Sequence, residues 1–191
     1  MNKFLILILF LLISPIIIIS MIMVYFEDGR PLILSQDRIG HNKKVFKLYK
    51  IRTMYNSAPI LGTHEVSKSH YLKVGKLLRA AKVDELPQVI NYLKGELNIV
   101  GPRPGMPNQN KLTEEREKQN IFKSMPGITG LSQILGYDMS DPELLAKVDR
   151  LYIENKSIRL DINIVIATFI VNRRNSIKNK FINEIVKFEN V

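Results

Sequence analysis

The sequence contains no cysteine, and this absence excludes disulfide bonds and thiolate chemistry. Histidine is scarce: His41, His64 and His70 do not have the spacing of a metal-binding set, which argues against a zinc site. Tryptophan is absent, and the chain shows no internal repeat and no low-complexity segment. These absences remove disulfide scaffolds, thiol enzymes and zinc centres from the classes of protein to consider.

Acidic residues are also in short supply. The 191 residues include 28 lysines and arginines against 18 aspartates and glutamates, a formal net charge of +10. Such an excess suits nucleic acid, anionic lipid or phosphorylated substrates as partners. The positive residues are dispersed and no nucleic-acid-binding motif is present, so we expect no nucleic-acid partner. The length is sufficient for one domain with a hydrophobic core.

An uncharged, mostly apolar run extends from Phe4 to Phe26. As a helix it measures about 34 Å, at about 1.5 Å per residue, which is enough to cross a bilayer. A signal peptide matches this run poorly, because Ile18-Ile19-Ser20 does not resemble a cleavage site, so a spanning anchor and a re-entrant hairpin are the stronger alternatives. Ser14-Pro15 lies near its middle, where proline kinks a helix and the Ser14 hydroxyl can bond a freed carbonyl. In the hairpin, Lys3 and Arg30 would lie on the same side of the membrane.

Two extended segments follow, at 30–39 and 45–53, and the polar residues between them predict a β-hairpin. The second segment carries Lys47, Lys50 and Arg52. These cations either guard a solvated strand edge or form a basic wall that binds phosphate. Residues 58–69 are predicted to form a loop.

The most informative stretch is Lys82-Val83-Asp84-Glu85-Leu86-Pro87-Gln88. Apolar residues recur after it at helical spacing, and Gly95 stands where a C-terminal cap is expected. Pro87 is tolerated in the first turn of such a helix, because its missing N–H would have no partner there. The apolar stripe comprises Leu86, Val89, Ile90 and Leu93.

Asp84 and Glu85 therefore stand at the start of a helix with a buried face. One interpretation is capping, because acidic residues are favoured in any first helical turn. The other is a carboxylate nucleophile or an acid–base pair at the positive end of the helix. The stretch alone leaves both open.

A second candidate follows in Gly101-Pro102-Arg103-Pro104, where two prolines stiffen the backbone around Arg103. A pre-ordered guanidinium suits bidentate phosphate binding, although a rigid turn with a solvent-facing arginine has the same sequence. The loop Pro126-Gly127-Ile128-Thr129-Gly130-Leu131 has glycines that allow close approach of a ligand, which is a weak signal.

The C-terminal half is predicted to be helical. Residues 111–122 form an exposed helix with no site, and Asp141-Pro142-Glu143 opens a helix that reaches Asn155. The tail is amphipathic and basic, so it is predicted either to lie on an anionic membrane surface or to dock on a protein. Its apolar positions are Ile177, Phe181, Ile185 and Phe188.

Several of these stretches together resemble the small monotopic phosphoglycosyl transferases of the bacterial sugar transferase family. The resemblance spans nearly the whole chain, and its most specific elements are Asp84-Glu85-Leu86-Pro87-Gln88 and Gly101-Pro102-Arg103-Pro104. The chain departs from the family pattern after Gln133, where it has Leu135-Gly136-Tyr137-Asp138 instead of Asn-Gly-Arg. The other matching elements are Ser14-Pro15, 46–54, Leu78-Arg79, 93–95, 126–131, Tyr152, 155–157 and 160–161.

The resemblance implies a reaction in which a UDP-sugar donates its phosphosugar to a polyprenyl (undecaprenyl) phosphate and releases UMP. It implies a ping-pong mechanism with Asp84 as nucleophile and metal ligand, Glu85 as its dyad partner and Mg²⁺ as cofactor. It further implies that Lys50, Arg79 and Arg103 bind the substrate phosphates.

The fold expected from these arguments is α+β and helix-dominated. A re-entrant membrane helix over residues 1–26, broken at Ser14 and Pro15, precedes a cytosolic catalytic domain over residues 27–191. This domain is expected to contain a short β-hairpin and interfacial amphipathic helices, with the C-terminal helix on the membrane surface.

The expected location is the cytoplasmic face of a bacterial inner membrane, with the phospholipid bilayer as a partner. A homodimer is left open. The alternative function is a non-enzymatic scaffold tethered to the membrane.

Overall fold

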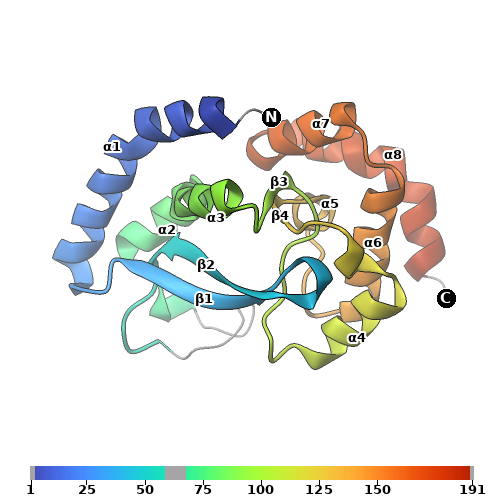
Figure 1. Cartoon of the computed structure of the whole chain (residues 1–191), viewed down its shortest axis with the longest axis horizontal. Helices are drawn as coiled ribbons and strands as arrows, with labels where there is room; N and C mark the ends of the chain where they lie inside the picture. The colour runs from blue at the N-terminus through green and yellow to red at the C-terminus, as the bar shows by residue number, and fades with distance from the viewer. Residues whose placement is uncertain (1–2, 59–67, 190–191) are drawn as a thin grey trace. The chain divides into compact units, whose positions relative to one another are not determined.

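The computed structural model describes residues 3–58 and 68–189, and helices dominate it as predicted (Figure 1). The chain divides into two compact units, one of Met1–Gln36 and Lys47–Gly95, the other of Asp37–Phe46 and Glu96–Val191. The chain passes from one unit to the other twice within the β-hairpin, after Gln36 and after Phe46, and once more after Gly95. The loop predicted at 58–69 falls mostly outside the described residues.

The first unit contains the base of the hairpin and the helices on either side of it. β1 and β2 pair with each other, which confirms the predicted hairpin. The predicted boundary between a membrane segment and a catalytic domain at residue 26 stays a prediction. The elements are α1 (Lys3–Asp28), β1 (Ile33–Ile39), β2 (Val45–Ile51), η2 (Lys68–His70), α2 (Lys73–Ala80), η3 (Val83–Gln88) and α3 (Val89–Lys94), with η marking a 3-10 helix.

Helix α1 packs one side against the first unit and exposes the other. Ile17 and Val24, two turns apart, are buried with Leu72 and Leu78 in a common cluster. Leu12 on another side of the helix is 71% exposed. The part Phe10–Asp28 is long and apolar enough to cross a membrane by length and composition.

Helix α1 continues through Ser14 and Pro15, so the expected break is absent. Pro15 has no N–H to donate to the carbonyl of Leu11, four residues earlier. The hydroxyl of Ser14 donates to that oxygen across 2.7 Å, which satisfies the acceptor that proline left free. Figure 1 shows that the helix bends strongly along its length. Ser14 and Pro15 thus lie inside one continuous helix, and the Ser14 hydroxyl satisfies the carbonyl that proline leaves free.

The end of α1 is fastened to the first unit by two carboxylates. Glu27 accepts the backbone N–H groups of Lys73 at 2.6 Å and Val74 at 2.9 Å, and so caps the first turn of α2. Asp28 pairs with the guanidinium of Arg52, which is only 2% exposed and also donates to the Asp28 carbonyl. Arg52 is therefore part of the fold and belongs neither to a solvated strand edge nor to a phosphate-binding wall, the two alternatives left open for it.

The second unit surrounds a two-stranded parallel sheet with helices. β3 pairs with β4, with Asn98 opposite Gly127 and Val100 opposite Thr129. Its elements are η1 (His41–Lys43), β3 (Asn98–Val100), α4 (Asn110–Lys118), η4 (Ile121–Lys123), β4 (Gly127–Thr129), α5 (Leu131–Leu135), α6 (Pro142–Glu154), α7 (Ile158–Phe169) and α8 (Val171–Glu189).

The glycines of this unit allow two backbone segments to touch. A Cβ atom on Gly127 would lie 2.1 Å from the Gly101 nitrogen, and one on Gly130 would lie 2.2 Å from the Gly101 oxygen. Only glycine tolerates such approaches. The weak glycine-loop signal therefore has a packing explanation here: the loop holds the Gly101–Pro104 segment in place.

Helix α4 is not the purely exposed surface helix that was expected. Its Arg116 is 3% exposed and donates from Nε and Nη2 to Oδ2 of Asp149 at 3.0 and 2.6 Å. Ser132 donates to the other oxygen of the same carboxylate at 2.8 Å. This buried network joins α4, α5 and α6. The predicted start of α6 is confirmed, because Asp141 accepts the N–H of Leu144.

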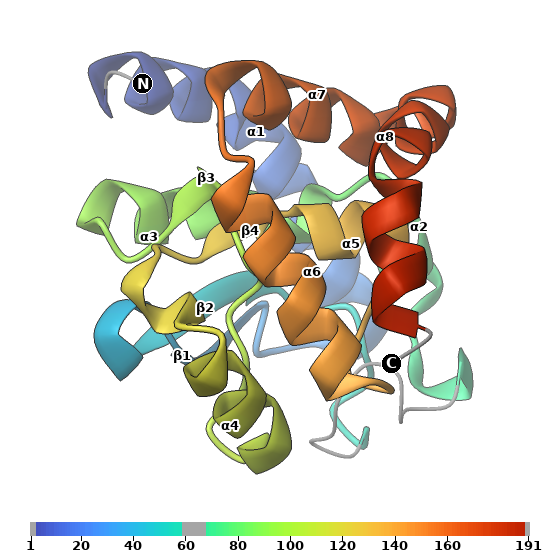
Figure 2. The same ribbon diagram turned by 90° about the vertical axis from the view of Figure 1, so that its right-hand side faces the viewer.

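Helix α8 buries the stripe on which membrane contact was predicted. Ile177, Phe181 and Ile185 are 6, 2 and 1% exposed and pack into the core of the second unit with Val148. These side chains cover the unit's own helices, so they are inaccessible to lipid. Figure 2 shows α8 beside α6, running away from α7.

Candidate active site

The predicted catalytic residues Asp84 and Glu85 lie just after α2, in η3. Helix α2 ends at Ala80, Lys82 adopts a left-handed conformation with φ 59°, and η3 begins at Val83. Gly95 caps α3 with φ 76°, as expected. The predicted helix is therefore a 3-10 turn containing Pro87, followed by a short α-helix.

Asp84 is buried in this turn and is 5% exposed. Its Oδ1 atom has no hydrogen-bond partner within the described part of the chain. The side chain of Lys82, the N-cap residue of η3, makes no cap hydrogen bond. A capping carboxylate would be satisfied by the helix N–H groups, so the bare oxygen favours the chemical interpretation of Asp84.

The electrostatic surroundings of Asp84 are mixed. Burial raises the pKa of its carboxyl group above the ordinary value, and the negative charge of Glu85 raises it further. The positive charges of Arg79, Lys50 and Lys82 act in the opposite direction but do not cancel these effects. The charges of Glu85, Lys50 and Arg79, three of the other four predicted site residues, therefore act on Asp84.

Arg79 is held in a fixed orientation by two neighbours. Its Nε donates to Oγ1 of Thr53 at 2.7 Å, and its Nη1 donates to the hydroxyl of Tyr71 at 3.2 Å. The backbone of Thr53 lies against α2, where a Cβ atom on Gly75 would be 2.2 Å from the Thr53 oxygen. Sequence reasoning did not find Thr53 or Tyr71 as positioning residues, although Thr53 lies within the matched stretch 46–54.

Lys50 is positioned through Asn91, another residue that the sequence analysis missed. Asn91 is completely buried; its Oδ1 accepts the N–H of Tyr49 at 3.2 Å and its Nδ2 donates to the Lys47 carbonyl at 2.6 Å. One amide thus fastens α3 to β2 on either side of Leu48. The effect is to fix the strand that carries Lys50.

Gln88 has an unexpected feature in the same 3-10 helix. It is 2% exposed, and its Nε2 atom has no acceptor among the described residues. A buried amide donor without an acceptor costs about 1–3 kcal/mol. Gln88 and Asp84 therefore leave one donor and one acceptor available in a single turn.

Arg103 belongs to the second unit. It projects from a segment whose Pro102 and Pro104 are buried, and the Ile39 N–H donates to the Gly105 carbonyl at 2.9 Å. Burial, and then the positive charge of Arg103, lower the pKa of Arg38 to about 10. Arg103 is thus flanked by two buried prolines, and its pre-ordered orientation and its binding of substrate phosphate beside Asp84 stay predictions.

The magnesium ion stays a prediction, and the feature of this site that suits it is one buried carboxylate oxygen without a partner among the described residues. Within residues 3–58 and 68–189, no three or more His, Cys, Asp or Glu side chains form a metal cluster. Mg²⁺ is commonly bound by one or two carboxylates together with substrate phosphates. Asp84 and Glu85 supply such donors, and Oδ1 of Asp84 is without a protein partner among the described residues.

A family model described as "Bacterial sugar transferase" matches residues 1–175. The "Uncharacterized sugar transferase EpsL" of Bacillus subtilis is 37% identical over 156 residues, covering 81% of this chain and 76% of that protein. A UDP-glucose:undecaprenyl-phosphate glucose-1-phosphate transferase of Caulobacter vibrioides is 30% identical, covering 82% and 62%.

A longer relative from Aeromonas hydrophila is a UDP-N-acetylgalactosamine-undecaprenyl-phosphate N-acetylgalactosaminephosphotransferase. It is 31% identical over 167 residues, and the match covers 82% of this chain and 39% of that protein. The family match includes the buried Asp84 turn, Arg79, whose charge acts on Asp84, and the Arg103 segment. This chain therefore belongs to the bacterial sugar transferase family.

Proposed function

We propose that the protein transfers a phosphosugar from a UDP-sugar to a polyprenyl phosphate such as undecaprenyl phosphate and releases UMP. The observation that carries this proposal is the bare, buried Oδ1 of Asp84 in the field of Arg79 and Lys50. The relatives named above support the substrate classes, because two of them are named for transfer from UDP-sugars to undecaprenyl phosphate.

In the first step, an oxygen of the ionised Asp84 carboxylate attacks the phosphorus that carries the sugar. An aspartyl–phosphorus bond forms while the bond from that phosphorus to the UMP oxygen breaks, and UMP leaves with the electron pair. UMP is a good leaving group, so the step does not require a strong general acid. The product is a phosphosugar linked to Asp84.

In the second step, a phosphate oxygen of the polyprenyl phosphate attacks the same phosphorus. The aspartyl–phosphorus bond breaks, the Asp84 carboxylate is regenerated and a polyprenyl diphosphosugar is released. No proton is gained or lost over the two steps when the phosphates stay ionised. The two substrates occupy the site in turn, which is a ping-pong order.

The main obstacle is repulsion between the carboxylate and the phosphates. At about 4 Å and an effective dielectric of about 20, each pair of like charges costs about 4 kcal/mol. Arg79, held by Thr53 and Tyr71, and Lys50 supply fixed positive charge, and Arg103 would add a third cation. Mg²⁺, held by Asp84 with Glu85 alongside, would supply further charge neutralisation when bound.

The membrane arrangement belongs to the same proposal. A polyprenyl phosphate presents its phosphate at headgroup height, whereas a UDP-sugar arrives from the water. The strong bend of α1, within which Ser14 satisfies the carbonyl that Pro15 leaves free, supports a re-entrant helix with both ends on the cytoplasmic side. Glu27 and Asp28 connect that helix to α2 and to Arg52, which would keep the Asp84 turn near the interface.

Release of UMP tests the proposal. The purified full chain, given Mg²⁺, polyprenyl phosphate and a panel of UDP-sugars, should release UMP with at least one donor. Asp84→Asn should abolish release, whereas Glu154→Gln, which changes an exposed carboxylate paired with Arg150, should leave it unchanged. Normal turnover by Asp84→Asn on the same substrates would overturn the nucleophile assignment.

The alternative of a non-enzymatic membrane scaffold makes a different prediction for the same assay. A scaffold would release no UMP with any donor and would be indifferent to Mg²⁺. It would also leave the buried carboxylate and its cations without a chemical role.

A further inference from the structure

Gln88 is a buried polar residue that the mechanism above does not use. It ends the 3-10 helix η3, is 2% exposed, and has an Nε2 atom with no acceptor among the described residues. The buried residues of η3 are Asp84, Pro87 and Gln88. Their spacing of i, i+3 and i+4 places them on one side of a helical turn. The side of η3 that carries Asp84 therefore also carries Gln88.

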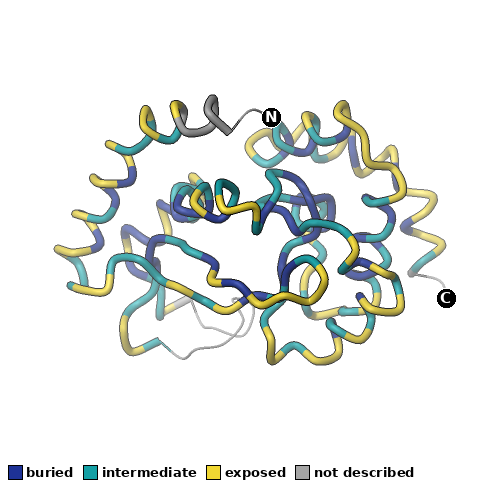
Figure 3. Tube along the Cα trace, viewed as in Figure 1, coloured by how far each residue is buried: buried dark blue, intermediate teal, exposed yellow. Residues whose placement is uncertain are grey.

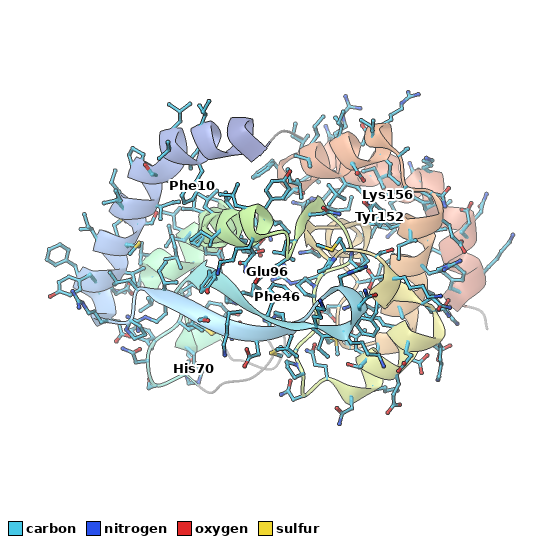
Figure 4. The ribbon with its side chains drawn as sticks, in the orientation of Figure 1. Phe10, Phe46, His70, Glu96, Tyr152 and Lys156 are labelled. Atoms are coloured by element: carbon cyan, nitrogen blue, oxygen red, sulfur yellow. The ribbon has the colours of Figure 1, made fainter. Side chains whose placement is uncertain are left out.

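The surroundings of η3 are largely apolar. The turn lies beside α1, α2 and α3, and Figure 3 shows buried and intermediate residues where α2 passes into α3. Val83 and Leu86 pack against the apolar cluster of the first unit, as does Phe10, labelled in Figure 4. In such a low-dielectric environment an unpaired N–H group is costly, and any hydrogen bond that it makes is strong. A donor kept at this cost calls for an acceptor that a ligand supplies.

The free donor and the free acceptor of η3 require opposite partners. Nε2 of Gln88 needs an acceptor, whereas Oδ1 of Asp84 needs a donor, a cation or an electrophile, and the two atoms do not bond to each other. A magnesium ion would satisfy the carboxylate oxygen alone, because a cation repels the positive end of an N–H group. A phosphoryl group satisfies both, since its phosphorus is electrophilic and its non-bridging oxygens accept hydrogen bonds.

We propose that Gln88 is a further catalytic residue, whose Nε2–H group donates a hydrogen bond to a non-bridging oxygen of the phosphorus that Asp84 attacks. This role rests on the phosphosugar transfer proposed above. The amide keeps its proton while the aspartyl–phosphorus bond forms and the bond to the UMP oxygen breaks, and it stabilises the charge on the oxygen that it holds. Because the amide is neutral, it does so without adding a charge that would lower the pKa of Asp84.

Thermal stability gives a first test that requires no activity. Gln88→Met keeps the length of the side chain and removes the unsatisfied donor, so it should raise the melting temperature by about 2–4 °C. The matched control is Gln109→Met, which removes an amide whose Oε1 accepts the Met106 N–H at 2.8 Å. That variant should melt at a lower temperature than the unmodified protein. A lower melting temperature for Gln88→Met would refute the proposal, because it would identify the amide as a satisfied structural group.

Kinetics of UMP release give the second test. Removing one donor to a charge that develops in the transition state should lower kcat of Gln88→Met by about 100-fold and change KM much less. Release of UMP by the unmodified protein together with an unchanged kcat for Gln88→Met would overturn the role of Gln88 and leave the transfer reaction standing. No release by the unmodified protein with any donor would overturn the transfer reaction, and the role of Gln88 with it.

A sulfur atom in the donor gives a readout that a structural role would not move. UDP-sugars with sulfur in place of one non-bridging oxygen of the sugar-bearing phosphorus exist as two diastereomers. Sulfur accepts hydrogen bonds poorly, so one diastereomer should react about tenfold more slowly with the unmodified protein, and the softer Mn²⁺ should not restore its rate. With Gln88→Met the same sulfur should cost less than about twofold, because the bond is already lost. Equal sulfur effects in the two proteins would contradict the proposed hydrogen bond.

Discussion

Nε of Arg79 donates a hydrogen bond to Oγ1 of Thr53 across 2.7 Å. Thr53 is 3% exposed, so this hydroxyl fixes the direction of the guanidinium from inside the fold. The side chain of Thr53 is thus a positioning group for a cation whose charge acts on Asp84, and it does not itself need to touch a substrate.

Thr53→Val should lower kcat/KM for UMP release by about tenfold, because a hydrogen bond to a charged group contributes roughly 1.5–3 kcal/mol. The effect should appear in kcat more than in thermal stability, because valine keeps the volume of the side chain. The matched control is Thr113→Val, which removes a hydroxyl that bonds the Gln109 carbonyl within α4. Unchanged kcat/KM in a folded Thr53→Val protein would show that Arg79 is oriented without it.

The pH dependence of the first step should report the raised pKa of Asp84. The nucleophile must be ionised, so activity is present above this raised pKa and is lost as pH falls through it. The acidic limb of kcat/KM should therefore lie above the ordinary carboxyl value of 3.8. Glu85→Gln removes a negative charge that raises the pKa, so the limb should move to lower pH. A limb that moves to higher pH would contradict this electrostatic account.

The same shift has the opposite consequence for stability. Asp84 binds a proton more tightly in the folded state than in the unfolded state, so stability falls as pH rises through the interval between the two pKa values. Asp84→Asn should therefore raise the melting temperature near neutral pH by about 2–4 °C, and the gain should disappear below the ordinary carboxyl pKa. Thermal unfolding of the unmodified protein and of Asp84→Asn across the pH range measures this difference in melting temperature. A lower melting temperature for the variant at neutral pH would contradict the prediction.

The bend of α1 should decide the topology of the N-terminus. Pro15→Ala restores the N–H that bonds the Leu11 carbonyl, so it should straighten the helix and favour a full crossing of the membrane. Because the chain has no native cysteine, Lys3→Cys provides a single label site. An impermeant thiol reagent outside the cytoplasmic membrane should label it only when Pro15→Ala is also present. Labelling with Pro15 intact would contradict the re-entrant arrangement.

Local signals in the sequence predicted local structure well. Gly95 takes the left-handed cap conformation and Asp141 caps α6, because each depends on a few neighbouring residues. The pair of acids at the start of a helix was also recognisable. The conformation of this stretch could not be predicted, because Pro87 lies in a 3-10 helix that begins after Lys82, which has a left-handed backbone conformation.

Choices among distant partners could not be predicted. Arg52 and Lys50 lie two residues apart in one basic segment. Arg52 forms an ion pair with Asp28, whereas the positive charge of Lys50 lowers the pKa of Asp84. The apolar stripe of α8 has the pattern of a membrane helix and is instead covered by the core. The pattern shows that a face is apolar, and the tertiary fold determines what covers it.

The most direct test of the account is the intact mass of the protein after incubation with its UDP-sugar donor and Mg²⁺ alone. The account predicts that the mass increases by one phosphosugar, that the increase is absent in Asp84→Asn, and that it disappears when polyprenyl phosphate is added. A preparation that turns over with both substrates but never gains mass with the donor alone would contradict the aspartyl intermediate.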